Sequence, residues 1–241
     1  MLDAAMRAEG ADTFGTRPFA MGGESFVLDR SGALYWPERK TLIAADLHFE
    51  KGSSYARRGQ FLPPYDTRET LSRLASVITR YEVRTFIALG DSLHDRKAHE
   101  RVMPDDLAAL RELQTGRDWI WLSGNHDPEL DASLAGEVMG TVELGRITLR
   151  HEPSNGLAGH EIAGHLHPAA RLLRHGCTIR RPCFFGTRQR LIMPAFGAFT
   201  GGLNILDPAF GMVHGGAEDA SVFMLGRDGL YPVPMKSLCA D

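Results

Sequence analysis

The sequence has few cysteines and no long apolar run. Its 241 residues include three cysteines, Cys177, Cys183 and Cys239, with no CxxC pair among them. They form no even disulfide set and fit reduced thiols, which we interpret as packing residues. The longest uncharged run, Leu191 to Leu206, is shorter than the roughly 20 residues that span a bilayer, and prolines and glycines interrupt it. We therefore expect no membrane-spanning helix and no membrane partner.

A marked excess of charge is also absent. Lys and Arg number 27 against 30 Asp and Glu, a net charge of −3, so any basic patch for a nucleic acid must be local. Residues 1–24 lack the apolar stretch of a secretory signal, which makes the cytoplasm the expected compartment. No repeat or linker divides the chain. We predict a partly flexible N-terminal extension over residues 1–24 and a single domain over residues 25–241.

Apolar patterning predicts an α/β first half and a β-rich second half. Three short apolar runs are typical of buried strands: 41–45, 85–89 and 119–122. Helices are predicted between them, one from Asp66 with leucines at helical spacing and one after Pro104. Short strand-like pieces follow from Thr141 onward, with a C-terminal hairpin about residues 226–229.

Polar clusters stand at the ends of the predicted strands. Asp46-Leu47-His48 follows the first buried strand, Gly90 to Asp95 the second, and Gly124-Asn125-His126-Asp127 the third. Two later clusters are His151-Glu152-Pro153 and Gly164-His165-Leu166-His167. Ligands bind at the carboxyl ends of strands in open α/β sheets, and alternate residues of an extended segment lie on one face. We therefore expect these side chains to converge on one site.

Histidine and carboxylate together predict a metal centre. Half of the chain's 10 histidines belong to the set that we select from these clusters, namely His48, His126, His151, His165 and His167. Imidazole with carboxylate suits Mn, Fe or Zn, and a mixed set of this size is too large for one tetrahedral ion. Two ions that share a carboxylate would use the whole set of ligands. Read singly, each Asp or His is more simply a helix cap, a turn residue or a core residue.

The ordered clusters resemble those of the calcineurin-like metallophosphoesterase superfamily. The segments 45–52, 55–59 and 62–67 further resemble the ligase-associated DNA damage response endonuclease family, PdeM. The resemblance implies a two-sheet β-sandwich flanked by helices, in four α/β/β/α layers. It also implies one metal on Asp46, His48 and His167, a second on Asn125, His151 and His165, and Asp91 as the bridge.

The resemblance also implies a catalytic role for His126, which would face the substrate without binding a metal. Many superfamily members have Asp three residues after the bridging Asp, whereas this chain has His94 there and Asp95 next. Both His94 and Asp95 are therefore catalytic candidates beside His126. A positioned imidazole would stabilise the alkoxide that leaves a phosphodiester.

The implied function is a phosphodiesterase or endonuclease that uses two divalent ions, most simply Mn²⁺, with Fe or Zn as alternatives. DNA during repair would be its substrate, and a DNA ligase, exonuclease or helicase of the same repair process its protein partner. Two other functions stay open: a hydrolase of small nucleotides or phosphomonoesters, and a non-catalytic binding protein on this fold.

Local positive charge supports the DNA interpretation. Between Gly164 and Leu206 there is no Asp or Glu, but there are six arginines. We select Arg180 and Arg181 from this run, and Arg57 and Arg58 after the first cluster, as substrate-binding candidates that would contact phosphates. The alternative is a solvated strand face or surface loop.

Overall fold

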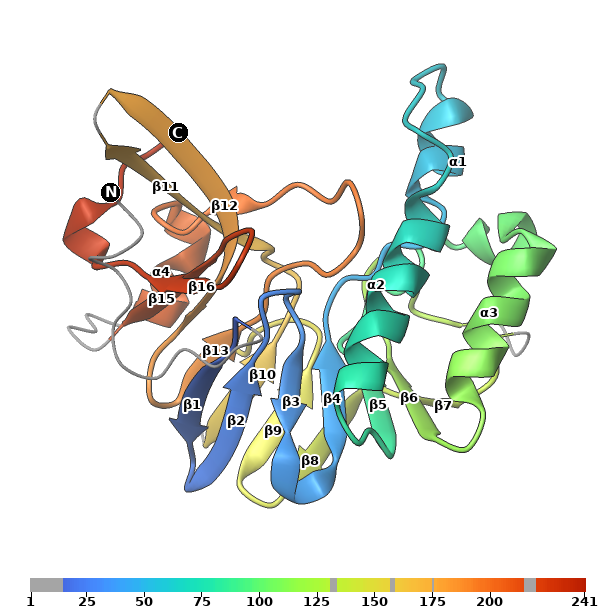
Figure 1. The fold of residues 1–241 in the computed structure, drawn as a ribbon, viewed down its shortest axis with the longest axis horizontal. Coiled ribbons are helices and arrows are strands. Elements are labelled where there is room, and N and C mark those ends of the chain that lie inside the picture. The colour runs from blue at the N-terminus through green and yellow to red at the C-terminus, as the bar shows by residue number, and fades with distance from the viewer. Residues whose placement is uncertain (1–14, 131–133, 157–158, 175, 215–219) are drawn as a thin grey trace.

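The computed structural model describes residues 15–130, 134–156, 159–174, 176–214 and 220–241. Two mixed β-sheets pack face to face, and two long helices cover the outer face of the first (Figure 1). Among these residues, no helix combines the length and apolarity needed to cross a bilayer.

The first sheet has seven strands in sequence order, antiparallel from β1 to β4 and parallel from β4 to β7. Its strands are β1 (Arg17–Met21), β2 (Glu24–Leu28), β3 (Leu34–Trp36), β4 (Thr41–Ala44), β5 (Thr85–Ala88), β6 (Asp118–Leu122) and β7 (Glu137–Met139). The helical elements of this half are η1 (Pro37–Arg39), α1 (Lys51–Ala56), α2 (Asp66–Arg80), η2 (Ala98–Arg101) and α3 (Pro104–Gln114).

The second sheet runs in the order β14-β11-β12-β13-β10-β9-β8, and β15 and β16 continue it from β12. Its strands are β8 (Thr141–Leu144), β9 (Ile147–Arg150), β10 (His160–Ala163), β11 (Pro168–Arg174), β12 (Cys177–Gly186), β13 (Arg190–Ile192), β14 (Leu203–Asn204), β15 (Ser221–Leu225) and β16 (Leu230–Pro232). Its helical elements are η4 (Pro208–Phe210), α4 (Gly211–His214) and η5 (Met235–Ser237).

Strand alternation explains why β4 and β5 are apolar throughout. Leu42 and Phe86 point to the core under α2 and α3, whereas Ile43 and Ile87 point to the core between the sheets. Successive side chains of a strand face opposite sides, so a strand buried on both faces needs apolar residues at every position. A third core on the outer face of the second sheet contains Phe210 of η4. The predicted sandwich is confirmed, with the outer helical layer there formed by η4 and α4.

The N-terminal boundary differs from the sequence prediction. We expected residues 1–24 to be an extension, but β1 pairs with β2 through the register Arg17 to Leu28, and Met21 is 3% exposed. The sheet therefore begins before residue 25, because alternate residues of β1 reach the core between the sheets. Residues 1–14 of the predicted extension lie outside the described residues. Of the three cysteines, Cys183 is core, while Cys177 is exposed rather than packed.

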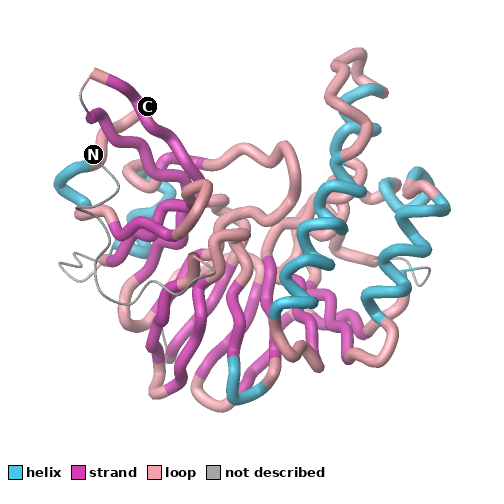
Figure 2. Tube along the Cα trace, in the orientation of Figure 1, coloured by secondary structure: helices cyan, strands magenta, loops and turns pink. Residues whose placement is uncertain are grey.

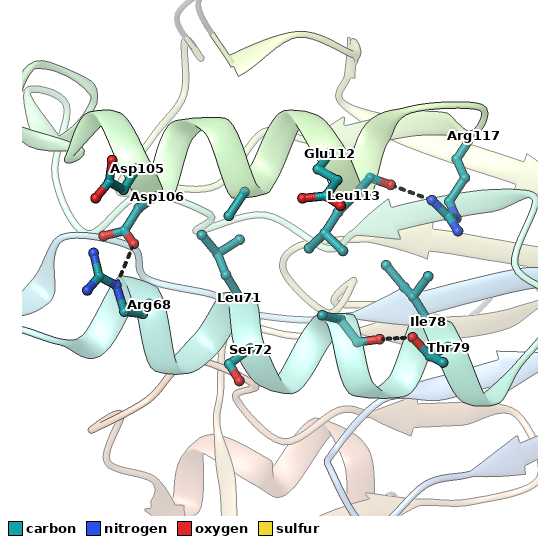
Figure 3. Close-up of a pocket in the computed structure, with 12 residues that line it drawn as sticks. Arg68, Leu71, Ser72, Ile78, Thr79, Asp105, Asp106, Glu112, Leu113 and Arg117 are labelled. Carbon is teal, nitrogen blue, oxygen red and sulfur yellow. Dashed lines mark hydrogen bonds and ion pairs between the residues drawn. The ribbon is translucent and has the colours of Figure 1, made fainter.

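A groove of about 580 Å³ separates the exposed sides of α2 and α3. Figure 3 shows Arg68 of α2 paired with Asp106 of α3 across it, at 3.1 Å, and Leu71 and Ile78 pointing into it. None of the predicted site residues lines this groove. The metal ligands predicted from the sequence lie instead in the loops that follow the strands. Figure 2 shows these loops in pink.

Candidate metal centre

The polar clusters occupy loops whose backbone is unusual. Non-glycine residues with left-handed backbone include Asp46 (φ 54°), His48 (φ 46°), Asp91 (φ 46°), His165 (φ 68°) and His167 (φ 44°). We expected Asp46 and His48 to share one face of an extended segment. That geometry is wrong, because both residues turn the chain into the left-handed region. Such strain is retained where surrounding contacts impose it, which is common at functional sites.

Main-chain hydrogen bonds hold these loops side by side. His48 N–H donates to the Asp91 carbonyl at 2.9 Å, and Asp46 N–H donates to the Gly90 carbonyl at 3.3 Å. Asp46 also receives the His165 N–H on its carboxylate, at 3.0 Å to Oδ2. The ends of β4, β5 and β10 are thereby fixed around one point.

Asp46, His48 and His167 form the first group of converging donors. Their ligand atoms lie within 4.8 Å of one another. His48 Nε2 lies 3.3 Å from His167 Nε2, and His167 Nε2 lies 3.3 Å from Asp46 Oδ1. These are the three residues predicted for the first metal.

The second group centres on His151. Its Nε2 lies 3.0 Å from Asn125 Oδ1, 3.2 Å from His165 Nδ1 and 3.4 Å from Asp91 Oδ1. His151 Nδ1 contacts the Leu89 carbonyl at 2.9 Å, which orients the ring with Nε2 directed at the group. All three residues predicted for the second metal, and the predicted bridge Asp91, are therefore together.

Gly90 makes the approach of His151 possible. A Cβ on Gly90 would lie 2.5 Å from the His151 ring, and its φ of +76° is one that side chains rarely adopt. The glycine before the predicted bridge is thus required by both space and conformation.

Burial and charge give the donor set an affinity for positive charge. Burial and then His167 lower the pKa of His48 to about 2, which keeps the ring neutral as a ligand must be. Burial opposes ionisation of Asp91, yet its hydrogen bond with His151 lowers the pKa of Asp91 to about 2. Against burial, contact with Asp91 and the charge of Asp46 raise the pKa of His151 to about 9.

These residues fit divalent cations. Asp46 and Asp91 are 0% and 2% exposed, and buried carboxylates need compensating positive charge. The short contact between His48 Nε2 and His167 Nε2 needs a proton or a cation between two nitrogen lone pairs. His48 Nδ1 is buried with no hydrogen-bond partner within the described structure. Imidazole, carboxylate and amide oxygen are the ligands that Mn, Fe and Zn accept.

The structure places His126 beside Asp91 without burying it. The backbone N–H of His126 donates to Asp91 Oδ1 at 2.9 Å, and the ring Nε2 lies 3.9 Å from Asp91 Oδ2. The side chain is 41% exposed. His126 Nδ1 contacts the His94 carbonyl oxygen at 2.8 Å. The residue that orients His126 is therefore His94, through its main chain rather than its ring.

The other two catalytic candidates, His94 and Asp95, have different surroundings. The His94 ring stacks on that of His126 with centroids 5.5 Å apart, and it shares a possible donor group with His48 and His126. Asp95 instead pairs with Arg101 at 2.6 Å. Although burial raises it, hydrogen bonds from Arg101 and Ser54 lower the pKa of Asp95 to about 2. Asp95 thus anchors the loop that carries His94.

Sequence reasoning missed Asp127, the last residue of the Gly-Asn-His-Asp cluster. Asp127 is fully buried and accepts hydrogen bonds from Leu93 N–H at 2.9 Å and Gly124 N–H at 3.1 Å. It ties the loop after β5 to the loop after β6. Burial raises the pKa of Asp127 to about 7. Its position beside His126 was visible in the sequence, but its partners are backbone groups, which leave no sequence signal.

The four arginine candidates have different surroundings. Arg57 and Arg58 are exposed directly after α1. Arg180 is also exposed, but it pairs with Asp241 at 3.0 Å and donates to the Gly202 carbonyl, whereas Arg181 contacts the Arg180 carbonyl. Another member of the acid-free run, Arg190, is 1% exposed and pairs with Glu161 at 2.8 Å, so it is structural.

Comparisons with known proteins show which proteins this chain resembles. A model of the calcineurin-like phosphoesterase family matches residues 39–221. The crystal structure of the Pseudomonas putida nuclease MPE is similar over 90% of this chain and 100% of that one, with 32% identity and a TM-score of 0.69. The E. coli phosphoesterase Yfce is matched over 83% of this chain and 96% of that one, with 16% identity and a TM-score of 0.38. No curated protein matches.

Proposed function

The chain belongs to the calcineurin-like phosphoesterase family and is a metal-dependent phosphoesterase, and we propose that it is a binuclear nuclease that hydrolyses phosphodiester bonds in DNA. The observation that carries the proposal is the convergence of two donor groups around Asp91 and His151. The similarity to the P. putida nuclease supports a nucleic-acid substrate.

Asp46, His48 and His167 would hold one ion, and Asn125, His151 and His165 the other, with Asp91 shared between them. We propose Mn²⁺ as the ion, with Fe and Zn as alternatives that the same ligands accept. When bound, two such ions lower the pKa of a coordinated water and neutralise charge on phosphoryl oxygens.

The protein's own residues supply the remaining requirements. His126 presents Nε2 on the Asp91 side because its Nδ1 faces the His94 carbonyl. With Nδ1–H donating to that carbonyl, the ring carries a second proton on Nε2 only as the imidazolium, and in that form it can give the Nε2 proton to the alkoxide that leaves a phosphodiester. Asp127 and Asp95 hold the loops that carry this pair. Arg57, Arg58, Arg180 and Arg181 would contact DNA phosphates outside the metal centre, with Arg180 first having to leave Asp241.

The setting of the reaction belongs to the proposal as well. We place the activity in DNA repair in the cytoplasm, with a DNA ligase, exonuclease or helicase acting on the same DNA. The support is the resemblance of the segments 45–52, 55–59 and 62–67 to the PdeM family and the likeness to a nuclease.

The test uses purified protein with Mn²⁺, and Asp91→Asn as the control. The substrates are bis(4-nitrophenyl) phosphate, 4-nitrophenyl phosphate, and single- and double-stranded DNA. We expect hydrolysis of the diester and of DNA, lost in the control. Faster cleavage of the monoester with intact DNA would instead identify a small-substrate hydrolase. Failure to cleave any substrate, with two metals bound, would identify a binding protein.

A further inference from the structure

An acid-free segment with exposed aromatic rings follows the first metal-ligand cluster. From Lys51 to Tyr65 the sequence has three basic residues and no Asp or Glu. Phe61 is 87% exposed and Tyr65 is 62% exposed, in the loop between α1 and α2. In Figure 1 this loop projects beyond the end of α2.

The base of this segment touches the site. The Tyr55 ring lies 5.7 Å from the His94 ring, centroid to centroid, and Lys51 Nζ lies 5.9 Å from the Tyr55 ring centroid. Glu50, just before α1, accepts a hydrogen bond from the Thr67 hydroxyl of α2 on its carboxylate and donates its backbone N–H to the same hydroxyl. The segment is therefore in contact with His94, the residue whose carbonyl orients His126.

A second exposed ring stands on a loop fixed at both ends to the first metal group. Gly197 N–H donates to the Asp46 carbonyl at 3.0 Å, and Leu203 N–H donates to the His167 carbonyl at 2.9 Å. Between these anchors, Phe199 is 48% exposed and has a φ of 56°. A left-handed backbone is a genuine strain for so bulky a residue. Phe199 thus lies on a loop whose backbone is bonded to Asp46 and His167, and its ring is partly open to water.

Rings exposed near a phosphodiester site suit the bases of unpaired nucleotides. Every base has a π-face, so stacking on aromatic side chains binds single strands with little dependence on sequence, and nearby basic residues follow the phosphates. Arg57 and Arg58 supply that charge on the same segment as Phe61, whereas Lys51 is only 8% exposed. Apolar rings alone would also suit a protein partner, but the exposed Arg57 and Arg58 on the same segment, next to a hydrolytic site, favour a polyanionic strand.

We propose that Phe61 and Phe199 are specificity-determining residues that stack on unpaired bases of the substrate strand. This inference rests on the proposed nuclease function and adds the contacts that select unpaired nucleotides. Phe199 would hold the base next to the scissile phosphate, because its loop is anchored on Asp46 and His167. Phe61 would hold a base farther along the strand.

The test measures binding in EDTA, so that no cleavage occurs. Two fluorescein-labelled strands are compared by anisotropy: a 12-nucleotide thymidine oligomer and a strand of equal length and charge whose residues are all abasic. The variants are Phe61→Ala, Phe199→Ala and the aromatic replacements Phe61→Trp and Phe199→Trp. Val138→Ala is the control, since Val138 is 46% exposed on the edge strand β7.

Wild type should bind the thymidine strand more tightly than the abasic strand. Each alanine variant should lose between about 5-fold and about 150-fold of that preference, the range for one stacked base. Affinity for the abasic strand should stay the same, and each tryptophan variant should restore the preference. Val138→Ala should match wild type on both strands.

Other outcomes overturn the inference. They are a wild type that does not distinguish the strands, alanine variants that keep the full preference, or variants that lose affinity for both strands equally. If the two rings instead serve to bind another protein, the alanine variants would keep the full preference for the thymidine strand. The proposed function is tested separately by wild-type hydrolysis of bis(4-nitrophenyl) phosphate with Mn²⁺. This diester has no nucleobase that could stack on either ring.

Discussion

Gly124→Ala should damage the metal centre without removing any ligand. A Cβ at Gly124 would lie 2.2 Å from both the backbone nitrogen and Oδ1 of Asp91, and 2.7 Å from Oδ1 of Asp127. Real Cβ atoms essentially never approach other atoms under 3.0 Å. The Asp91 backbone cannot yield alone, because the Asp91 carbonyl accepts the His48 N–H. The methyl group must therefore push apart the loops after β5 and β6.

The expected cost follows from this overlap. Inserting an extra carbon into a packed region costs about 1–3 kcal/mol. For a chain of this size, each 1 kcal/mol lowers Tm by about 2–4 °C, so the Tm of the metal-free protein should fall by about 2–12 °C. Gly140→Ala is the matched control, because a Cβ there meets nothing within 4 Å. Alanine lowers the entropy of the unfolded chain relative to glycine, so Gly140→Ala should leave the free energy of unfolding unchanged or raise it by less than about 1 kcal/mol.

Calorimetry of the metal-free proteins and elemental analysis after loading with Mn²⁺ measure the two consequences. We expect Gly124→Ala to melt lower and to retain less metal than wild type, since the shifted Asp91 is the proposed bridge. Gly140→Ala should equal wild type in metal content. The reasoning is refuted if both variants have the same Tm and hold the same amount of metal.

Four further predictions concern substitutions in and around the site. Asp91→Asn should reduce metal content below that of wild type and abolish hydrolysis; elemental analysis that finds full loading in an active variant would contradict the bridging role. His126→Gln should lower turnover on DNA by about 10²–10⁴-fold with metal content unchanged, and less on nitrophenyl esters, whose leaving group needs little protonation; full activity would exclude the role. Replacing Arg57 and Arg58 with Gln should flatten the plot of log affinity for DNA against log salt by about 0.7–0.9 per lost contact; an unchanged slope would place DNA elsewhere. The pKa of Asp95 lies near 2, below its usual 3.8, so its ionised form stabilises the fold above the unfolded pKa. The Tm difference between wild type and Asp95→Asn should therefore shrink as pH falls from about 5 to about 2; a difference that does not change with pH would contradict the ion pair.

Features carried by local sequence pattern could be predicted. The buried strands β4, β5 and β6 show as apolar runs, and the polar clusters of the sequence contain Asn125, Asp91 and His165, which the structure brings together around His151. The alternation of Leu42, Ile43 and Ala44 between two cores is a direct result of strand geometry. Such patterns are readable because their periods depend only on the backbone.

Features that depend on distant backbone groups or partners could not be predicted. His126 is oriented by a carbonyl of the preceding loop, which any residue at position 94 would offer. Arg190 is buried because strand register puts it opposite Glu161, 29 positions away in the sequence. Arg180 meets Asp241 at the far end of the chain. In each case the informative contact is created by the fold, so the residue type alone does not distinguish a phosphate-binding arginine from a structural one.

The left-handed ligands join the fold to the proposed chemistry. An extended Asp-x-His segment would carry its donors along the strand, about 3.3 Å of rise for each residue. Left-handed residues at Asp46, His48 and Asp91 turn the chain instead, so the donors of neighbouring loops meet over the ends of β4 and β5. That conformation is unfavourable for L-residues, and the interloop hydrogen bonds from His48 and His165 oppose its relaxation. The strain thus stays where cations would be bound, held by the hydrogen bonds between the loops that carry the ligands.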